Sequence, residues 1–366
     1  TRDITALEPA ACACGRTVRR IRRIGRRSDD MLIVRGVNVF PSQVEAALLA
    51  VEGTVPHYQL VVSRPHGLDE LEVRVEVTPA VLEHGEYLVK HVLLCNDCHS
   101  ERDWTLYSGP AKPPLGAGRP CMDKDTKAVG INFGTGGFPG RLCIRNITPD
   151  VESGIGGWTD GEIARAIREG VSRNGEALFP IMPWFMYTGM SDEDVGAVIA
   201  YLRAQPPVKS FRPDRQLDFP LNIIFRFYPQ PLSGPVASVP RSDTVAYGQY
   251  LSRIARCEFC HTARIRGQVE PLPDRLFSGG VPFVMGTRTQ YSKNLTPHPT
   301  GLGDWTKEIF IGRFRLHTVP FAVTEEDNSE MDWVAFSGMT DGDLGAIWDF
   351  LQTLPPLETK LLDRAD

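Results

Sequence analysis

Two five-residue strings of the form C-x-x-C-H constrain this chain more than any other feature. The first spans positions 95–99 and the second spans positions 257–261. Two cysteines three positions apart on a helical turn can each form a thioether with a haem vinyl group, and the histidine that follows can bind the iron as its proximal ligand. The strings therefore predict two covalently bound haems c. The residues expected to hold them are the tethering cysteines Cys95, Cys98, Cys257 and Cys260 and the proximal histidines His99 and His261.

The sequence around the strings is an internal repeat. G-E-Y-L before the first string matches G-Q-Y-L before the second, and N-I-T-P and G-I-G-G-W-T after the first match N-L-T-P and G-L-G-D-W-T after the second. Each copy ends in a segment with helical spacing, which a capping residue (Ser191 or Thr340) opens and a Pro-Pro pair stops. We expect two tandem helical haem domains, at 81–208 and 242–358, joined by a proline-rich linker at 209–241.

Residues 1–80 carry no haem signal and have a different pattern. An apolar run at 31–34 has strand character, and positions 41–49 have helical spacing with a proline at the start. Positions 58–63 and 71–78 read as two further strands, the second with alternating apolar residues. The pattern predicts a small β-α-β-β unit.

A haem iron held by histidine still has a sixth position, and methionine there raises the reduction potential, as suits an electron-transfer cytochrome. Two methionine pairs recur ahead of the last helix of each copy: Met182 with Met331, and Met190 with Met339. The first pair lies within the loop near an aromatic residue and is the preferred choice. The second pair stands at the helix cap and is the alternative, with core packing as the commoner role of any methionine.

Other histidines and tryptophans have less support as ligands. His91 and His317 have no counterpart in the other copy, so we interpret each as a polar surface residue or as the neighbour of a haem propionate. Trp158 and Trp305 do recur. We expect both to be buried packing of the haem pockets, because an indole contributes a large apolar area.

Composition excludes some classes of protein. The net charge of −5 gives no reason to expect a nucleic-acid partner, and there is no run of about 18 apolar residues that would predict a transmembrane helix. No apolar signal-peptide core stands near the start. Among the eight cysteines, Cys12 and Cys14 lie in the first segment. Cys121 and Cys143 follow the first string, and they form either a disulfide or two unpaired buried thiols.

The repeat resembles the dihaem cytochrome c subunits associated with membrane-bound alcohol, aldehyde and gluconate dehydrogenases. The shared motifs are G-E-Y-L, C-N-D-C-H, N-I-T-P-D, G-I-G-G-W-T-D, M-P-W and M-S-D-E-D. The resemblance implies a mainly α fold with two tandem class I cytochrome c-like domains. It also implies electron transfer in the periplasm, with a dehydrogenase subunit, a quinone or an oxidase as redox partner, in a peripheral membrane complex.

Residues 1–80 resemble a different family, the C-terminal lid of phenylacetate-CoA ligases, which are adenylate-forming enzymes. The matching stretches include T-R-D-I-T, C-x-C-G-R-T, R-S-D-D-M and R-G-V-N-V-F-P. In that family the aspartate matching Asp3 holds the nucleotide ribose, and the arginine matching Arg27 lies near the adenylate. Arg26 stands here where the family has glycine. The large nucleotide-binding domain and the adenylation lysine are not among these residues, so we expect a non-catalytic, lid-like α+β appendage.

Three other functions compete with electron transfer. A dihaem peroxidase needs one iron with an open sixth position, which matched methionines disfavour. An adenylate-forming CoA ligase needs the missing domain, and its lid works in the cytoplasm, whereas haem c is attached outside it. Zinc binding by the C-x-x-C pairs leaves the adjacent histidines and the repeat unexplained. The sequence therefore favours an electron-transfer protein or subunit over a stand-alone enzyme.

Overall fold

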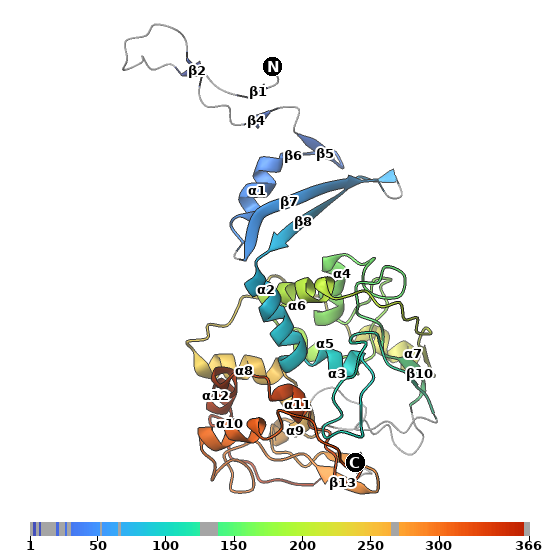
Figure 1. Ribbon diagram of the computed structural model, residues 1–366, viewed down its shortest axis with the longest axis vertical. Coiled ribbons are helices and arrows are strands. Elements are labelled where there is room, and N and C mark those ends of the chain that lie inside the picture. The colour runs from blue at the N-terminus through green and yellow to red at the C-terminus, as the bar shows by residue number, and fades with distance from the viewer. Residues whose placement is uncertain are drawn as a thin grey trace. The chain divides into compact units, whose positions relative to one another are not determined.

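The computed structural model describes residues 31–51, 53–64, 67–124, 138–264 and 271–361, together with four two-residue strands nearer the N-terminus (Figure 1). Those strands pair antiparallel, β1 (Asp3–Ile4) with β4 (Arg26–Arg27) and β2 (Leu7–Glu8) with β3 (Arg20–Ile21). Cys12 and Cys14 lie outside the described residues, and only the main chain of Asp3 and Arg27 is described. Contacts divide the chain into two units, Thr1–Val81 and Leu82–Asp366.

Between residues 31 and 78, the described part of the first unit contains one short helix and two hairpins. These elements are β5 (Leu32–Val34), β6 (Val37–Val39), α1 (Pro41–Leu48), β7 (Thr54–Ser63) and β8 (Glu70–Val77). The helix and the long strands match the predicted segments, and β6 is an additional strand that pairs with β5 through a turn at Gly36, whose φ is +81°. None of the described side chains between 31 and 81 is fully buried, so this part of the chain encloses no core of its own.

The second unit holds both haem strings. Its first copy consists of α2 (Pro79–Tyr87), which begins just before the unit boundary, the π-helical turn η2 (Leu88–Val92), α3 (Cys95–His99), β9 (Cys121–Met122), β10 (Gly140–Cys143), α4 (Asp160–Arg168), α5 (Trp184–Tyr187) and α6 (Asp192–Ala204). Its second copy consists of α8 (Thr244–Ile254), α9 (Cys257–His261), η4 (Pro273–Arg275), β12 (Pro282–Met285), β13 (Arg288–Tyr291), α10 (Lys307–Arg315), α11 (Trp333–Phe336) and α12 (Asp341–Leu351).

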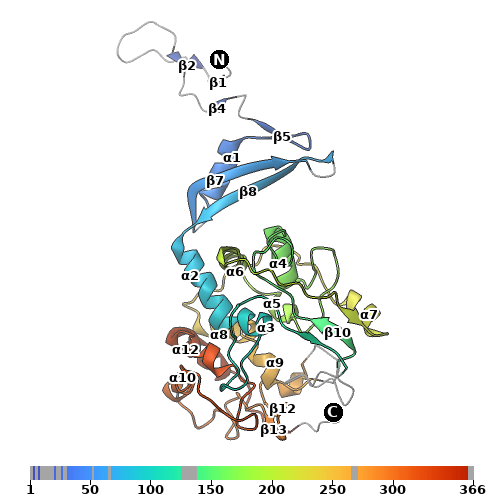
Figure 2. The same cartoon turned by 45° about the vertical axis from the view of Figure 1, so that its right-hand side comes forward.

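The first and last helices of each copy cross at very close range, and a glycine makes this possible. A Cβ on Gly85 would lie 2.0 Å from the main-chain oxygen of Ala197 in α6, and a Cβ on Gly248 would lie 1.8 Å from that of Ala346 in α12. Figure 2 shows α8 lying against α12. The steric requirement explains the glycine of G-E-Y-L and G-Q-Y-L, because any side chain there would separate the helices.

The last helices begin at the predicted caps. The Ser191 hydroxyl accepts a hydrogen bond from Asp194 N, and the Thr340 hydroxyl accepts one from Asp343 N, both at 3.1 Å. Each side chain satisfies an N–H group that would otherwise lack a partner in the first helical turn. The capping residues named from the sequence are therefore confirmed.

The two copies pack against each other through a reciprocal pair of tyrosines. Tyr87 donates to Asp343 Oδ2 at 2.6 Å and accepts from Thr340 N, at the start of the last helix of the other copy. Tyr250 makes the same two contacts in the opposite direction, with Asp194 Oδ2 and Ser191 N. Apolar side chains of both copies join in a single core, so residues 82–366 form one compact unit.

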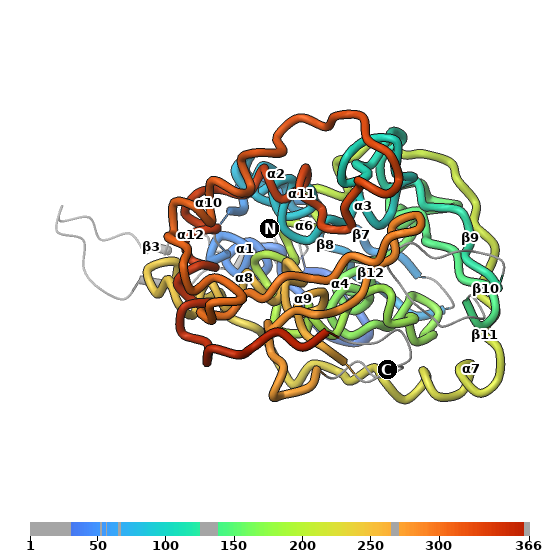
Figure 3. Tube along the Cα trace, turned by 90° about the horizontal axis from the view of Figure 1, so that it is seen from below, coloured from blue at the N-terminus to red at the C-terminus, as the bar shows by residue number. Residues whose placement is uncertain are grey.

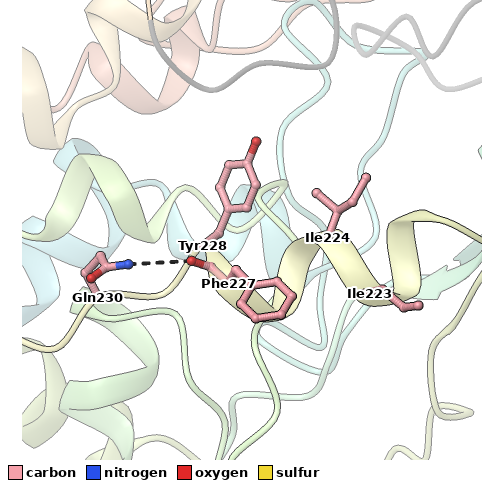
Figure 4. Close-up of a pocket in the computed structure, with 5 residues that line it drawn as sticks. All are labelled: Ile223, Ile224, Phe227, Tyr228 and Gln230. Carbon is pink, nitrogen blue, oxygen red and sulfur yellow. Dashed lines mark hydrogen bonds between the residues drawn. The ribbon is translucent and has the colours of Figure 1, made fainter.

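The segment at 209–241, predicted as a linker, lies partly against the first copy. It contains β11 (Gln216–Leu217), α7 (Leu221–Ile224) and η3 (Phe225–Phe227). Strand β11 extends the β9–β10 pair to three strands, which lie together at one edge of the molecule (Figure 3). The side chains of Ile223, Ile224, Phe227, Tyr228 and Gln230 line a shallow surface hollow (Figure 4).

Apolar side chains of this segment remain open to solvent. Phe219 is 79% exposed and Phe227 is 75% exposed. Within the described part of the chain, no helix combines the length and the apolar character needed to cross a membrane.

Candidate haem-attachment sites

Both C-x-x-C-H strings have the same local structure. Each forms a five-residue helix, α3 or α9, and each is preceded by a residue in the left-handed region: Leu94 with φ 55° and Arg256 with φ 63°. That conformation costs a non-glycine residue roughly 1–2 kcal/mol, so the surrounding packing must hold it. The left-handed residue separates each string from the helix before it, so that each string forms a separate short helix.

The histidine of each string is held by one main-chain carbonyl. His99 Nδ1 lies 2.7 Å from the oxygen of Arg145, and His261 Nδ1 lies 2.6 Å from the oxygen of Lys293. A carbonyl only accepts, so Nδ1 carries the proton and Nε2 keeps the lone pair that binds a metal. Burial also lowers the pKa of both histidines, which favours the neutral, ligating form.

The N-x-T-P motif explains why the two carbonyls occupy matching places. Asn146 follows Arg145 directly, and its Oδ1 accepts from the N and Oγ1 of Thr148, while its Nδ2 donates to Val208 O at 2.7 Å. In the second copy, Asn294 Nδ2 donates to Leu357 O at 2.6 Å. Each asparagine thus ties the loop that supplies the carbonyl to the chain just beyond the last helix.

The six cysteines that the structure describes divide into two groups. Cys121 and Cys143 form a disulfide between β9 and β10, which settles the choice that the sequence left open. The four cysteines of the strings are free and half-buried. Burial raises the pKa of the Cys95 and Cys257 thiols to about 12, so these side chains are neutral thiols at neutral pH.

These groups fit a covalently bound haem c. In each copy two free thiols and a histidine with a free Nε2 lie on one short helix. In the first copy the indole Nε1 of Trp184, two residues after Met182, is buried without a hydrogen-bond partner among the described groups, and it is available as a donor to a haem substituent. A zinc site has less support, because the described residues contain no group of three or more His, Cys, Asp or Glu side chains placed to hold a metal ion.

The two methionine pairs differ in burial. Met182 and Met331 are partly buried at the margin of the core, and a turn of the same form follows each, from Trp184 N to Met182 O and from Trp333 N to Met331 O. Met190 and Met339 are wholly enclosed in the core.

The enclosed pair also has a structural task. The main-chain oxygens of Met190 and Met339 accept hydrogen bonds from Arg168 and Arg315, respectively, and these arginines also pair with Asp192 and Asp341 in the first turn of the last helix. The main chain at Met190 and Met339 is therefore tied to the starts of the last helices.

The remaining sequence candidates have different surroundings. Trp158 packs against the core, but Trp305 is 37% exposed, so the expectation that both are buried is wrong for Trp305. Arg203 donates to the main-chain oxygen of Trp158, whereas glutamine stands at the matching position 352. The turn around Trp305 therefore lacks this arginine anchor.

Both unmatched histidines lie where the copies meet. His91 Nδ1 is 2.8 Å from the oxygen of Ala335 in α11, so His91 contacts the other copy and is not a free surface residue. The ring of His317 is in tilted contact with the rings of Tyr107 and Trp333, with ring centroids 4.7 and 5.6 Å away. Neither of its ring nitrogens has a hydrogen-bond partner within the described part of the chain.

A group of charged residues near both strings is not marked by any sequence motif. We call it the interface charge cluster, and it consists of Asp97, Arg102, Arg119, Arg256, Glu330 and Asp332. Arg102 Nη2 lies 2.6 Å from Asp332 Oδ1, with the two side chains only 8% and 17% exposed. Arg256 Nη1 lies 3.7 Å from Cys98 Sγ. Burial raises the pKa of Glu330 to about 7, as expected for a carboxyl withdrawn from water.

The chain after the first string also holds the methionine loop of the second copy. Ser108 N donates to Asn328 Oδ1 at 2.8 Å, and Asn328 Nδ2 donates to the oxygens of Trp104 and Leu106. Ser108 Oγ donates to Met331 O at 2.9 Å. The first copy therefore positions the main chain around Met331. A lone asparagine and a serine give no sequence signal for such a role, because their partners lie more than two hundred positions away.

In comparisons with known proteins, two parts of the chain resemble two different families. Residues 36–92 match the family model described as AMP-binding enzyme C-terminal domain. Phenylacetate-coenzyme A ligase of Thermus thermophilus is 59% identical over 87 residues, which is 24% of this chain and 20% of the ligase. The family match runs past residue 80 into α2 and η2, and so overlaps the start of the haem repeat.

Dehydrogenase cytochrome subunits match a larger part of the chain. The cytochrome c subunit of the quinone alcohol dehydrogenase of Gluconacetobacter polyoxogenes is 32% identical over 238 residues, covering 60% of this chain and 49% of the subunit. The gluconate 2-dehydrogenase cytochrome c subunit of Pantoea cypripedii is 26% identical over 299 residues, covering 76% and 60%. The chain thus spans about half the length of such subunits. It combines a region that resembles dehydrogenase cytochrome c subunits with an N-terminal region that resembles the C-terminal domain of phenylacetate-CoA ligases.

Proposed function

We propose that this chain is a dihaem c-type cytochrome that carries electrons between a dehydrogenase or reduced carrier and the respiratory chain. The observation that carries the proposal is the matched geometry of the two strings. In both, a left-handed residue, a short helix with two free thiols and a histidine bonded through Nδ1 follow one another in the same order.

Each string has a defined set of roles in this proposal. Cys95 and Cys98 tether one haem and His99 is its proximal ligand, while Cys257, Cys260 and His261 do the same for the other. Haem c supplies one-electron chemistry at its iron when bound. The carbonyls of Arg145 and Lys293 hold the two imidazoles in the ligating tautomer.

Met182 and Met331 are the proposed distal ligands. They lie at the margin of the core in matching turns. Met190 and Met339 are instead fully buried, and their main-chain oxygens accept hydrogen bonds from arginines that also pair with the first turns of the last helices. A thioether at the sixth position raises the reduction potential and leaves no open site. This arrangement suits electron transfer and disfavours the alternative of a dihaem peroxidase.

Partners and location follow from the relatives and the disulfide. The matching subunits are named as parts of an alcohol dehydrogenase (quinone) and a gluconate 2-dehydrogenase, so we propose a dehydrogenase subunit as donor and a quinone or an oxidase as acceptor. The Cys121–Cys143 disulfide supports an oxidising compartment such as the periplasm. We assign the two haem domains to 81–208 and 242–358, with 209–241 between them.

The first unit is proposed to have no ligase activity. Its resemblance is to the C-terminal domain alone, and the described side chains between 31 and 81 enclose no core. Incubation of the purified chain with ATP, coenzyme A and phenylacetate should yield no thioester. Thioester formation dependent on ATP would show that residues 1–80 retain a catalytic role.

The direct test of the proposal is the covalent haem content. The full chain, exported with a signal peptide in cells that carry the haem-attachment machinery, should give a pyridine haemochrome spectrum of haem c and the mass of two haems. Replacing Cys95 and Cys98 with alanine should leave one haem. A wild-type protein with no covalent haem would disprove the proposal.

A further inference from the structure

Arg256 lies next to both haem strings: its main chain directly precedes the second string, and its side chain contacts the first. It is the left-handed residue directly before Cys257, and its Nη1 lies 3.7 Å from Cys98 Sγ. The matching residue of the first copy is Leu94, a fully buried leucine. The two copies are therefore alike in backbone at this point but differ by one half-buried charge.

We propose that Arg256 is a shared potential-setting cation, which lies between the two attachment strings and raises the reduction potentials of both haems. The inference rests on the dihaem function proposed above. Reduction adds one electron to a haem and takes its iron from ferric to ferrous, with no bond formed or broken. A nearby cation stabilises the added electron, and it does so most strongly where water does not screen it.

The surroundings of Arg256 keep its charge effective. Its Nε is buried without a hydrogen-bond partner among the described groups, and the hydrogen bond of its Nη1 ends on a sulfur, which is a weak acceptor. In the haem-loaded protein Cys98 is an uncharged thioether. A cation beside Cys98 would therefore not be neutralised by that side chain.

The interface charge cluster does not cancel this effect. It contains three arginines and three carboxyl groups, and Asp332 is already paired with Arg102 at 2.6 Å. Removing Arg256 leaves two arginines facing three carboxyl groups. The change makes the potential around both strings more negative, and each haem then becomes harder to reduce.

The test is a potentiometric titration of the haem-loaded full chain. Arg256→Met removes the charge and keeps an unbranched apolar stem, and Arg256→Lys keeps the charge. Arg253→Met is the matched control, because Arg253 also reaches the other copy, donating to Phe185 O at 3.1 Å, but is exposed to solvent. We expect the reduction equilibrium constant of each haem to fall about tenfold in Arg256→Met, which is 59 mV for one electron. Arg256→Lys and Arg253→Met should stay near the wild-type values.

The outcomes separate this inference from the proposed function. Wild-type protein without covalent haem would remove the proposed function itself. Unchanged potentials in an Arg256→Met protein that carries two haems would overturn the inference alone. A shift that disappears at high salt would also overturn it, because salt screens exposed charges far more than buried ones.

If Arg256→Met loses a haem, a second neutral substitution replaces it in the test. The potentiometric titration is then made on Arg256→Gln, which keeps an N–H donor without the charge. If both neutral variants lose a haem while Arg256→Lys retains two, Arg256 serves attachment and the inference is overturned.

Discussion

At the scale of single residues, the two proposed iron sites depend on main-chain carbonyls as much as on side chains. The oxygens of Arg145 and Lys293 select the tautomer of His99 and His261, and a partner of this kind orients a ligating histidine and increases its basicity. Asn146 holds the first of these carbonyls in place through Thr148 and Val208. Residues that never touch iron therefore determine whether the histidine can bind it.

Substitution of the two methionine pairs separates their roles. Met182→Leu and Met331→Leu should each abolish the methionine–iron charge-transfer band of one oxidised haem and lower its reduction potential, because a hydrocarbon cannot replace the thioether ligand. Met190→Leu is the matched control and should keep the band, since it conserves volume in the core at a cost below about 1.5 kcal/mol. Absorption spectra of the oxidised proteins are the measurement. Loss of the band in Met190→Leu with retention in Met182→Leu would reverse the assignment.

At this scale the sequence predicts what is local. The caps at Ser191 and Thr340 follow from short-range hydrogen-bonding patterns, and the structure confirms them. The roles of Arg256 and Asn328 depend on partners far along the chain, and no local pattern encodes such contacts. Trp305 also shows that a repeated motif does not guarantee repeated burial.

At the scale of elements, one helix crossing organises each copy. The glycines of the crossings leave the main chains of the paired helices almost in contact. The same helices also carry the tyrosines that join the copies. One short motif, G-x-Y-L, therefore serves packing within a copy and contact between copies.

Alanine at a crossing glycine should destabilise the protein strongly. A Cβ on Gly85 would lie 2.0 Å from Ala197 O, so Gly85→Ala must move a helix, and we expect a loss of about 1–3 kcal/mol or more in the free energy of unfolding. Gly196→Ala is the control, because Gly196 lies in α6 next to Ala197 and a Cβ there would meet nothing within 4 Å. That variant should be neutral or more stable by about 0.4–1 kcal/mol. Denaturant unfolding of both variants measures the difference, and equal stabilities would contradict the crossing.

The carboxyl group of Asp194 makes the contact between copies sensitive to acid. Burial raises the pKa of Asp194, but hydrogen bonds from His84 and Tyr250 outweigh it and leave this pKa below its ordinary value. A carboxyl whose pKa is lower in the folded state stabilises the fold fully above its unfolded pKa of about 4, and it loses that contribution at lower pH, as the pH falls through the folded pKa.

The stability of Asp194→Asn should show this dependence. Wild type should exceed Asp194→Asn in unfolding free energy at neutral pH, and the difference should shrink below about pH 4. Glu193→Gln changes the same charge at an exposed neighbouring position and should show a small effect throughout. A difference between wild type and Asp194→Asn that is constant from pH 7 to about pH 3 would argue against the charged Asp194 as the acceptor.

At the scale of the whole molecule, the chain joins two units of different character. The described part of residues 82–366 encloses a large core built from both copies of the repeat and a smaller cluster around Phe138, while the described side chains of the first unit enclose none. The repeat made the existence of two copies predictable. Their reciprocal packing was not predictable, because the motifs reflect local structure within one copy, whereas Tyr87 and Tyr250 form hydrogen bonds with the other copy.

The central claim is that each copy carries one covalently attached haem. The most direct measurement is the intact mass of the exported full chain together with its pyridine haemochrome spectrum. The account predicts two haems c per chain, with one lost when either pair of string cysteines is replaced by alanine. A wild-type chain that acquires no covalent haem, or that keeps both haems after such a replacement, would contradict it.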